Sequence, residues 1–179
     1  MRTNIHLSEG ERKAVGIMLG ALLADQFALG TRMRNCRWNA TGPQTLQRLF
    51  ALHDEILSKI LDDLSERARV TGNGKAAAVA EFLKLARSKA QPGVHPRAAQ
   101  ITAELLAGHE AVIYRLRDNL ALCSPPRGDV PTREFLNGLV LRHEKMAGEL
   151  RALAEQTNQR WANSQANRLE AQQATCDSI

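Results

Sequence analysis

The 179-residue sequence is poor in aromatic residues and in cysteine. Only 4% of its residues are Phe, Trp or Tyr while 44% are hydrophobic, so its core is expected to be packed by aliphatic side chains, as in helical proteins. The three cysteines, Cys36, Cys123 and Cys176, include no Cys-x-x-Cys pair. This argues against a disulfide framework or a zinc site and favours reduced thiols in a cytosol.

The sequence also lacks a long uncharged apolar run and an export signal. No stretch reaches about 18 uncharged apolar residues, so we predict no transmembrane helix and no membrane partner. The opening residues, MRTNIHLSEGERK, contain no apolar segment followed by a cleavage site. We therefore expect a cytoplasmic protein, and the length suits one domain with a sizeable core.

Lysine is missing from both ends of the chain. Residues 1–7 carry only Arg2 as a cation, and residues 162–179 carry one Arg against one Glu and one Asp. The net charge of +5 and the pI of about 9.5 therefore arise in the body of the protein. A basic excess of this size permits nucleic acid as a partner but does not require it.

Four long segments have apolar residues at every third or fourth position, which is typical of helices. A capping box, Ser8 with Glu11, marks the start of the first. The first predicted helix ends at the stop RWNATGP, and the second follows this stop and ends at about Val70. The third is predicted from about Arg97 to Leu122 and the fourth from about Thr132 to Trp161. A short helix, AAAVAEFLKLARS, is predicted between the second and third. We predict an all-α four-helix bundle as one domain, residues 1–161, and a flexible polar tail, residues 162–179.

Several motifs resemble the Dps family, the ferritin-like DNA-binding proteins from starved cells. They are LLAD and RWNATGP in the first helix, DDLSERARVTG at the end of the second, EFLKLARSKA in the connection, and GDVPTREFLNGLVLRHEKMAGELR in the last helix. They cover residues 7–155 in the family's order. The resemblance implies a ferritin-like shell of twelve bundles, built from dimers, that stores iron as Fe²⁺ and Fe³⁺, consumes peroxide and often coats DNA.

The resemblance also implies a ferroxidase site between two subunits, and half of it is present. Asp62 and Glu66, which match the family's carboxylates from the second helix, are four residues apart and share a helix face. Oxygen ligands of this kind suit Fe, Mn or Mg. A solvated helix face is the alternative interpretation, and the resemblance favours a half-site at the interface.

The other half of the implied site is substituted. Arg37 stands where the family has its first His, and the chain is two residues shorter than the family between Gly42 and Asp62. With this gap at the start of the helix, the second His position falls on Gln47 and the Asp position on Ala51. A guanidinium has no lone pair for a metal. We expect oxidation of ferrous iron with peroxide to be lost or greatly weakened, and Arg37 to pair with Asp62 and Glu66 of the neighbouring subunit.

The histidines offer no clear substitute ligand. An alternative alignment places His53 at the second His position, but His53 lies on an apolar stripe, which favours a core role. His109 and His143 also fall on or beside apolar stripes and are predicted to be packed in the core. The Glu-x-x-His motif of sites inside one bundle is absent where it would be expected.

Asp129 and Glu134 match the acidic residues that line threefold pores in similar proteins. Helix capping and stabilisation of the helix dipole are the alternative roles for both. Two functions follow from the resemblance: a mini-ferritin shell for iron sequestration and protection in oxidative or starvation stress, or a non-enzymatic shell that binds DNA weakly, associates with the nucleoid or acts as a scaffold. A helical adaptor without a shell is the third hypothesis.

Overall fold

The computed structural model describes residues 7–39, 43–71, 98–123 and 129–176. These residues form four α-helices, with no β-strand among them, and a short 3-10 helix. The predicted all-α bundle is confirmed, whereas the short helix predicted within residues 76–88 lies outside the described residues. The elements are α1 (Glu9–Asn39), α2 (Gln44–Val70), α4 (Ala98–Leu120), η1 (Ala121–Cys123) and α5 (Val130–Cys176).

The capping box at the start of α1 is confirmed. The backbone N–H of Ser8 donates to Oε2 of Glu11 at 2.8 Å, and the backbone N–H of Glu11 donates to Oγ of Ser8 at 3.2 Å. The two residues thereby satisfy one backbone donor each at the helix end. The start of the first helix could therefore be read from two residues of sequence.

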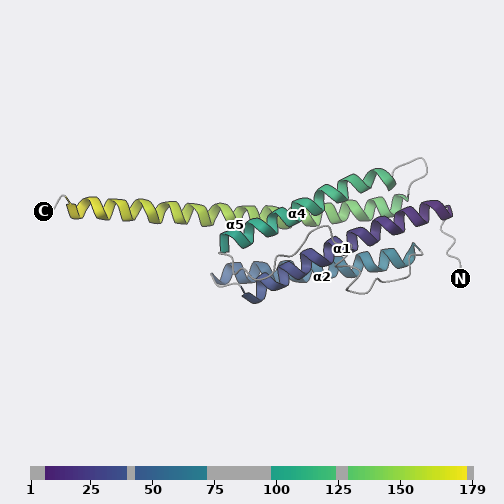
Figure 1. Cartoon of the computed structure of the whole chain (residues 1–179), viewed down its shortest axis with the longest axis horizontal. Coiled ribbons are helices and arrows are strands. Elements are labelled where there is room, and N and C mark those ends of the chain that lie inside the picture. Colours follow the sequence, from purple (N-terminus) through teal and green to yellow (C-terminus); the bar gives the residue numbers. More distant parts are fainter. Residues whose placement is uncertain (1–6, 40–42, 72–97, 124–128, 177–179) are drawn as a thin grey trace.

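The four helices lie along one another and form a bundle (Figure 1). α1 packs against α2 and α4, and α5 packs against α4 and α2, so the main contacts make a closed ring of four neighbours. The apolar stripes of all four helices face the centre of this ring. Their largest fully buried side chains include Leu19, Met33, Phe50, Leu57, Ile60, Leu105, Leu116, Leu139 and Met146.

α1 contains a long apolar window, and most of its apolar side chains are buried. Its length and composition would suffice to cross a membrane, but most of its apolar window is buried inside the protein, as in the core helix of a bundle. Asp25 is also buried there and pairs with Arg115 of α4 at 2.9 Å. Gly108 lets α4 approach α1 closely, because a Cβ at this position would lie 2.8 Å from Cδ1 of Leu29.

α5 is longer than the sequence predicted. We expected it to end near Trp161, but it continues to Cys176, and this last part extends beyond the other helices (Figure 1). Residues 162–176 contain neither Gly nor Pro and are rich in Ala, Gln and other good helix formers. The boundary was wrong because a loss of apolar residues removes a reason to pack but does not by itself end a helix.

Candidate functional site

Arg37 lies in the last turn of α1 and contacts α2 of its own chain. Its Nη1 donates to Oδ2 of Asp54 at 2.7 Å, and Nη2 of Arg34 lies 3.2 Å from Oδ1 of the same carboxylate. The Asp54 side chain is only 5% exposed, whereas the two arginine side chains are 44% and 47% exposed. Arg34 also donates to Oγ of Ser58 at 3.0 Å. A buried carboxylate is therefore held by two half-exposed guanidinium groups.

The substituted ligand positions lie on the same face of α2 as this carboxylate. Gln47 is exposed and Ala51 is half-buried, and Asp54 follows Ala51 by about one turn. The region where the resemblance predicts His and Asp ligands thus contains an amide, a methyl group and a carboxylate that is already paired. These groups do not match the ligand set that the resemblance implies.

The predicted carboxylate half-site is exposed in the single chain. Asp62 and Glu66 both face outward, and Glu66 accepts a hydrogen bond from Nε of Arg69 at 2.8 Å. This hydrogen bond holds the pKa of Glu66 below its usual value, and the charge of Arg69 acts in the same direction. Asp62 is eight residues after Asp54, or about 12 Å along the helix, so the two half-sites of one chain cannot share an ion.

Asp129 is buried at the N-terminus of α5 and makes a compact set of contacts there. Its Oδ1 accepts from the backbone N–H of Thr132 at 3.1 Å, which caps the helix. Nη2 of Arg67 donates to both carboxylate oxygens at 3.0 and 3.1 Å, and Nε of Arg67 donates to Oγ1 of Thr132 at 2.8 Å. These are the capping contacts of the alternative interpretation. Glu134 is exposed, and pore lining by either acidic residue stays a prediction.

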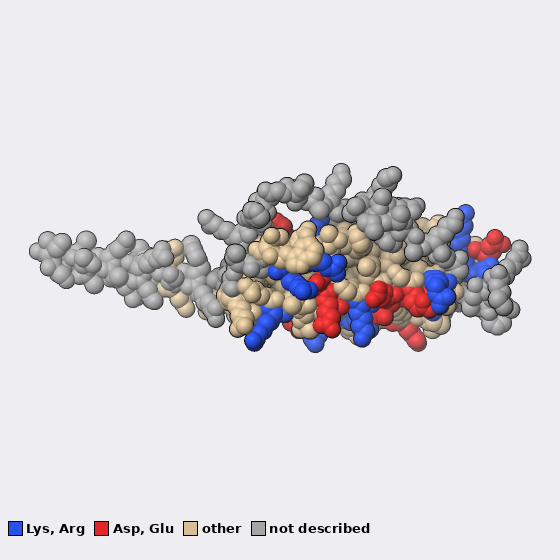
Figure 2. All heavy atoms as spheres, turned by 90° about the horizontal axis from the view of Figure 1, so that it is seen from below, with Lys and Arg blue, Asp and Glu red and all other residues tan. Residues whose placement is uncertain are grey.

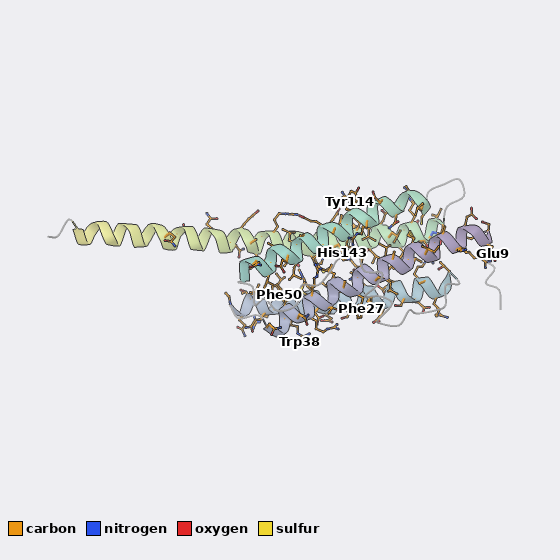
Figure 3. The ribbon with its side chains drawn as sticks, in the orientation of Figure 1. Glu9, Phe27, Trp38, Phe50, Tyr114 and His143 are labelled. Carbon is orange, nitrogen blue, oxygen red and sulfur yellow. The ribbon has the colours of Figure 1, made fainter. Side chains whose placement is uncertain are left out.

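Three histidines meet in the centre of the bundle, one each from α2, α4 and α5. His53, His109 and His143 are fully buried, so their predicted core placement is confirmed, and Figure 3 shows His143 within the bundle. Nδ1 of His109 lies 3.0 Å from Nδ1 of His143, and the ring centres of His53 and His109 are 6.0 Å apart. Nε2 of His53 lies 2.7 Å from Oε2 of Glu149 on α5. We call these three residues the histidine cluster.

Burial determines the protonation of the cluster. It lowers the pKa of His109 to about 2 and that of His143 to about 4, and the charges of neighbouring groups act in the same direction. Burial also lowers the pKa of His53, although the hydrogen bond and the charge of Glu149 oppose this change. The three imidazoles are therefore neutral at neutral pH.

The sequence did not single out Asp54 or Glu149. The sequence does contain a sign that Asp54 is unusual, because this charged residue lies beside His53 on the apolar stripe of α2. Glu149 had none, since its contact depends on how α5 is placed against α2. Within the described segments, no three His, Cys, Asp or Glu side chains are grouped as ligands of one metal ion.

The surface shows charges of both signs close together. On the face in Figure 2, Lys and Arg alternate with Asp and Glu, so this face has no continuous basic patch. Several large apolar side chains are also exposed, among them Trp38 at 69% and Leu52 at 49%, near Arg37 and Asp54 in the sequence, and Tyr114 at 68% on α4. Figure 3 shows Trp38 at the end of α1 and Tyr114 at the outer edge of α4.

Comparison with known proteins gives consistent relatives, although no protein-family model matches the chain. The sequence is 34% identical over 156 residues to an uncharacterized low temperature-induced protein of Nostoc sp., which covers 86% of this chain and 87% of the relative. It is 28% identical over 148 residues to DNA protection during starvation protein 2 of Bacillus anthracis, covering 80% of this chain and 99% of that protein.

The fold matches solved structures closely. DpsC from Streptomyces coelicolor superposes with a TM-score of 0.78 at 19% sequence identity, covering 85% of this chain and 90% of that one. At this identity the match shows a shared fold. The bundle described above is therefore the fold of that protein.

Proposed function

Because this chain belongs to the Dps family of ferritin-like proteins, we propose that it forms a cytoplasmic homo-oligomeric shell, a dodecamer built from dimers, that sequesters iron and protects the cell in oxidative or starvation stress. We further propose that the usual ferroxidase site between subunits is lost. The observation that carries this second point is the pairing of Arg37 and Arg34 with Asp54, in the region where the family has metal ligands.

The chemistry of this region supports the proposed loss. A guanidinium cannot ligate a metal, and Asp54 is already held by two cations. Two positive charges next to the site also repel a ferrous ion. Arg37 and Ala51 offer no donor and Gln47 offers at most an amide oxygen, so two of the three ligands that the family resemblance implies for this half have no replacement.

The role of Arg37 between subunits is part of the same proposal. A guanidinium has five N–H donors, and the contact with Asp54 uses Nη1. The guanidinium of Arg37 therefore has enough further N–H donors to bind Asp62 and Glu66 of a neighbouring subunit as well. Exposed Trp38 and Leu52 nearby support a subunit contact at this end of α1 and α2, because large exposed apolar residues gather at interfaces.

The test is anaerobic loading of the protein with ferrous iron, followed by peroxide and measurement of ferric absorbance. We expect the wild-type protein to retain iron during size-exclusion chromatography and to oxidise it no faster than protein-free buffer. The variant R37H/Q47H/A51D, which supplies the family's ligands, should oxidise it faster. The matched control R37Q removes the guanidinium without adding an imidazole and should stay at the wild-type rate.

Two outcomes would contradict the proposal. Oxidation by the wild-type protein well above the protein-free rate would show that a ferroxidase site persists. A monomer or dimer in solution would remove the shell, because a dodecamer has a mass of about 236 kDa, twelve times 19.7 kDa. Crystals soaked in iron would add a direct check, with no metal expected between Arg37 and Asp54.

The second candidate function is a non-enzymatic shell that binds DNA or acts as a scaffold on the nucleoid. Its support is the basic excess of the chain, which would give twelve copies a charge of about +60. The relative from Bacillus anthracis carries DNA protection in its name. Neither tail contains the lysines that would make such binding strong.

A further inference from the structure

The contact between His109 and His143 in the histidine cluster requires that at least one of the two rings is neutral. Nδ1 of His109 and Nδ1 of His143 face each other at 3.0 Å, so one must donate and the other must accept. Protonation of the accepting ring at Nδ1 would place two N–H groups against each other and break this contact. The pair therefore depends on at least one ring being uncharged.

The remaining nitrogens of the cluster give an added proton no acceptor. Nδ1 of His53, Nε2 of His109 and Nε2 of His143 are all buried without a hydrogen-bond partner. In the neutral pair, the ring that donates at Nδ1 leaves an unused acceptor at Nε2, and the ring that accepts at Nδ1 carries its proton on Nε2 without a partner. Protonation of either ring would bury a further unpaired donor together with a charge, which is far more costly.

Of the described charged groups that contact the cluster, only Glu149 can offset such a charge, and it does so at His53. Glu149 contacts His53, and Arg142 acts on His143 in the direction that opposes protonation. Gln26 of α1 is buried and neutral and donates to the backbone oxygen of Leu57. The carboxylates next to the three histidines in the sequence, and Asp25 next to Gln26, are paired with arginines of another helix: Asp25 with Arg115, Asp54 with Arg34 and Arg37, Glu110 with Arg151, and Glu144 with Arg117.

We propose that His53, His109 and His143 form an acid-sensitive latch, which joins α2, α4 and α5 while the rings are neutral and separates these helices when the rings gain protons. His53 is the ring best able to accept the first proton, because Glu149 can balance its charge. That charge, 6.0 Å from the centre of His109, then makes protonation of the other two rings harder inside the folded bundle.

The direction of the pH effect follows from where protons bind. The usual pKa of histidine is 6.5, whereas burial lowers the pKa of His143 to about 4 and that of His109 to about 2. Below pH 6.5 the unfolded chain therefore binds protons that the folded chain excludes. Each such histidine raises the unfolding equilibrium constant by up to about tenfold per pH unit as the pH falls, and two of them by up to about a hundredfold.

The experiment is urea unfolding of the full chain at a fixed protein concentration, followed by far-UV circular dichroism between about pH 7 and pH 5. This window lies above the usual pKa values of Asp and Glu, so carboxylates contribute little to the slope. We expect the unfolding constant of the wild-type protein to rise steeply below pH 6.5. The double variant H109Q/H143Q should lose most of this rise. The matched control E144Q alters a carboxylate next to His143 that pairs with Arg117, and should keep the wild-type slope.

A second measurement covers the case in which H109Q/H143Q does not fold. Potentiometric titration of the wild-type protein over the same pH range, with and without urea, counts the protons bound in each state. We expect the unfolded chain to take up about 1.5 more protons than the folded chain, because a histidine with its usual pKa gains about 0.7 proton over this range and His109 and His143 gain almost none when folded. Equal uptake in the two states, or an unfolding constant that does not change with pH, would overturn the latch. Neither readout involves iron, so the latch and the proposed function fail independently.

Discussion

At the scale of single residues, Asp54 explains why two arginines approach a buried helix. A carboxylate that is 5% exposed has little water around it and needs donors from the protein. Arg34 and Arg37 supply them while keeping much of their guanidinium groups in water. Such a pair adds little net stability, because desolvation of the carboxylate offsets the attraction, but loss of both cations is costly.

We therefore expect the variant R34A/R37A to unfold at a lower urea concentration, with a loss of about 1–3 kcal/mol from the unpaired buried carboxylate. Equilibrium denaturation at neutral pH measures this change. The triple variant R34A/R37A/D54N, in which the charge is also removed, should recover part of the loss. An R34A/R37A protein as stable as the wild type would mean that Asp54 finds other partners or water.

At the scale of helices, one set of contacts joins the end of α2 to the start of α5. Arg67 lies in the DDLSERARVTG motif at the end of α2. Its guanidinium donates to both carboxylate oxygens of Asp129 and to the hydroxyl of Thr132. Asp129 caps α5 at the same time. The two motifs are far apart in the sequence, yet together they fix where α5 begins relative to α2.

Replacement of Asp129 tests this junction. D129A should destabilise the protein by about 1–2 kcal/mol, because it removes the cap of α5 and leaves Arg67 without its carboxylate. D129N keeps an oxygen that can accept the Thr132 N–H and should lose less. Thermal unfolding of both variants gives the comparison, and equal losses would show that the charge contributes nothing beyond the cap.

At the scale of the whole molecule, charge is spread rather than concentrated. The face in Figure 2 alternates in sign, and the net charge of +5 has no lysine-rich tail to focus it. Any attraction of the proposed shell for DNA then comes from its summed charge. Such attraction acts through release of counterions and falls steeply with salt.

We expect weak retardation of duplex DNA in gel shifts at low salt and none near physiological salt. The salt dependence reflects the number of phosphates neutralised, and few are expected here. Addition of several lysines at the N-terminus would be the matched gain-of-function control. Binding that resists physiological salt would contradict this prediction and favour the DNA-binding function.

Much of the fold was predictable from local patterns. Apolar spacing placed the helices, and Ser8 with Glu11 marked the start of the first. The end of α5 was not predictable from apolar spacing, because residues 162–176 stay helical through their propensity after apolar residues become sparse. The substitutions at Arg37, Gln47 and Ala51 were also visible in sequence, but the partner of Arg37 within its own chain was not.

The sequence by itself determined the helices, the bundle and the family resemblance, since each depends on the order and spacing of residues along one chain. Only the tertiary structure decided that Arg37 contacts Asp54, that Asp129 is buried against Arg67, and that three histidines from three helices meet. The physical reason is that periodicity fixes the face of a helix on which a residue lies. It does not fix how far one helix is shifted or rotated against its neighbour, and a difference of one turn, about 5.4 Å, changes every such contact.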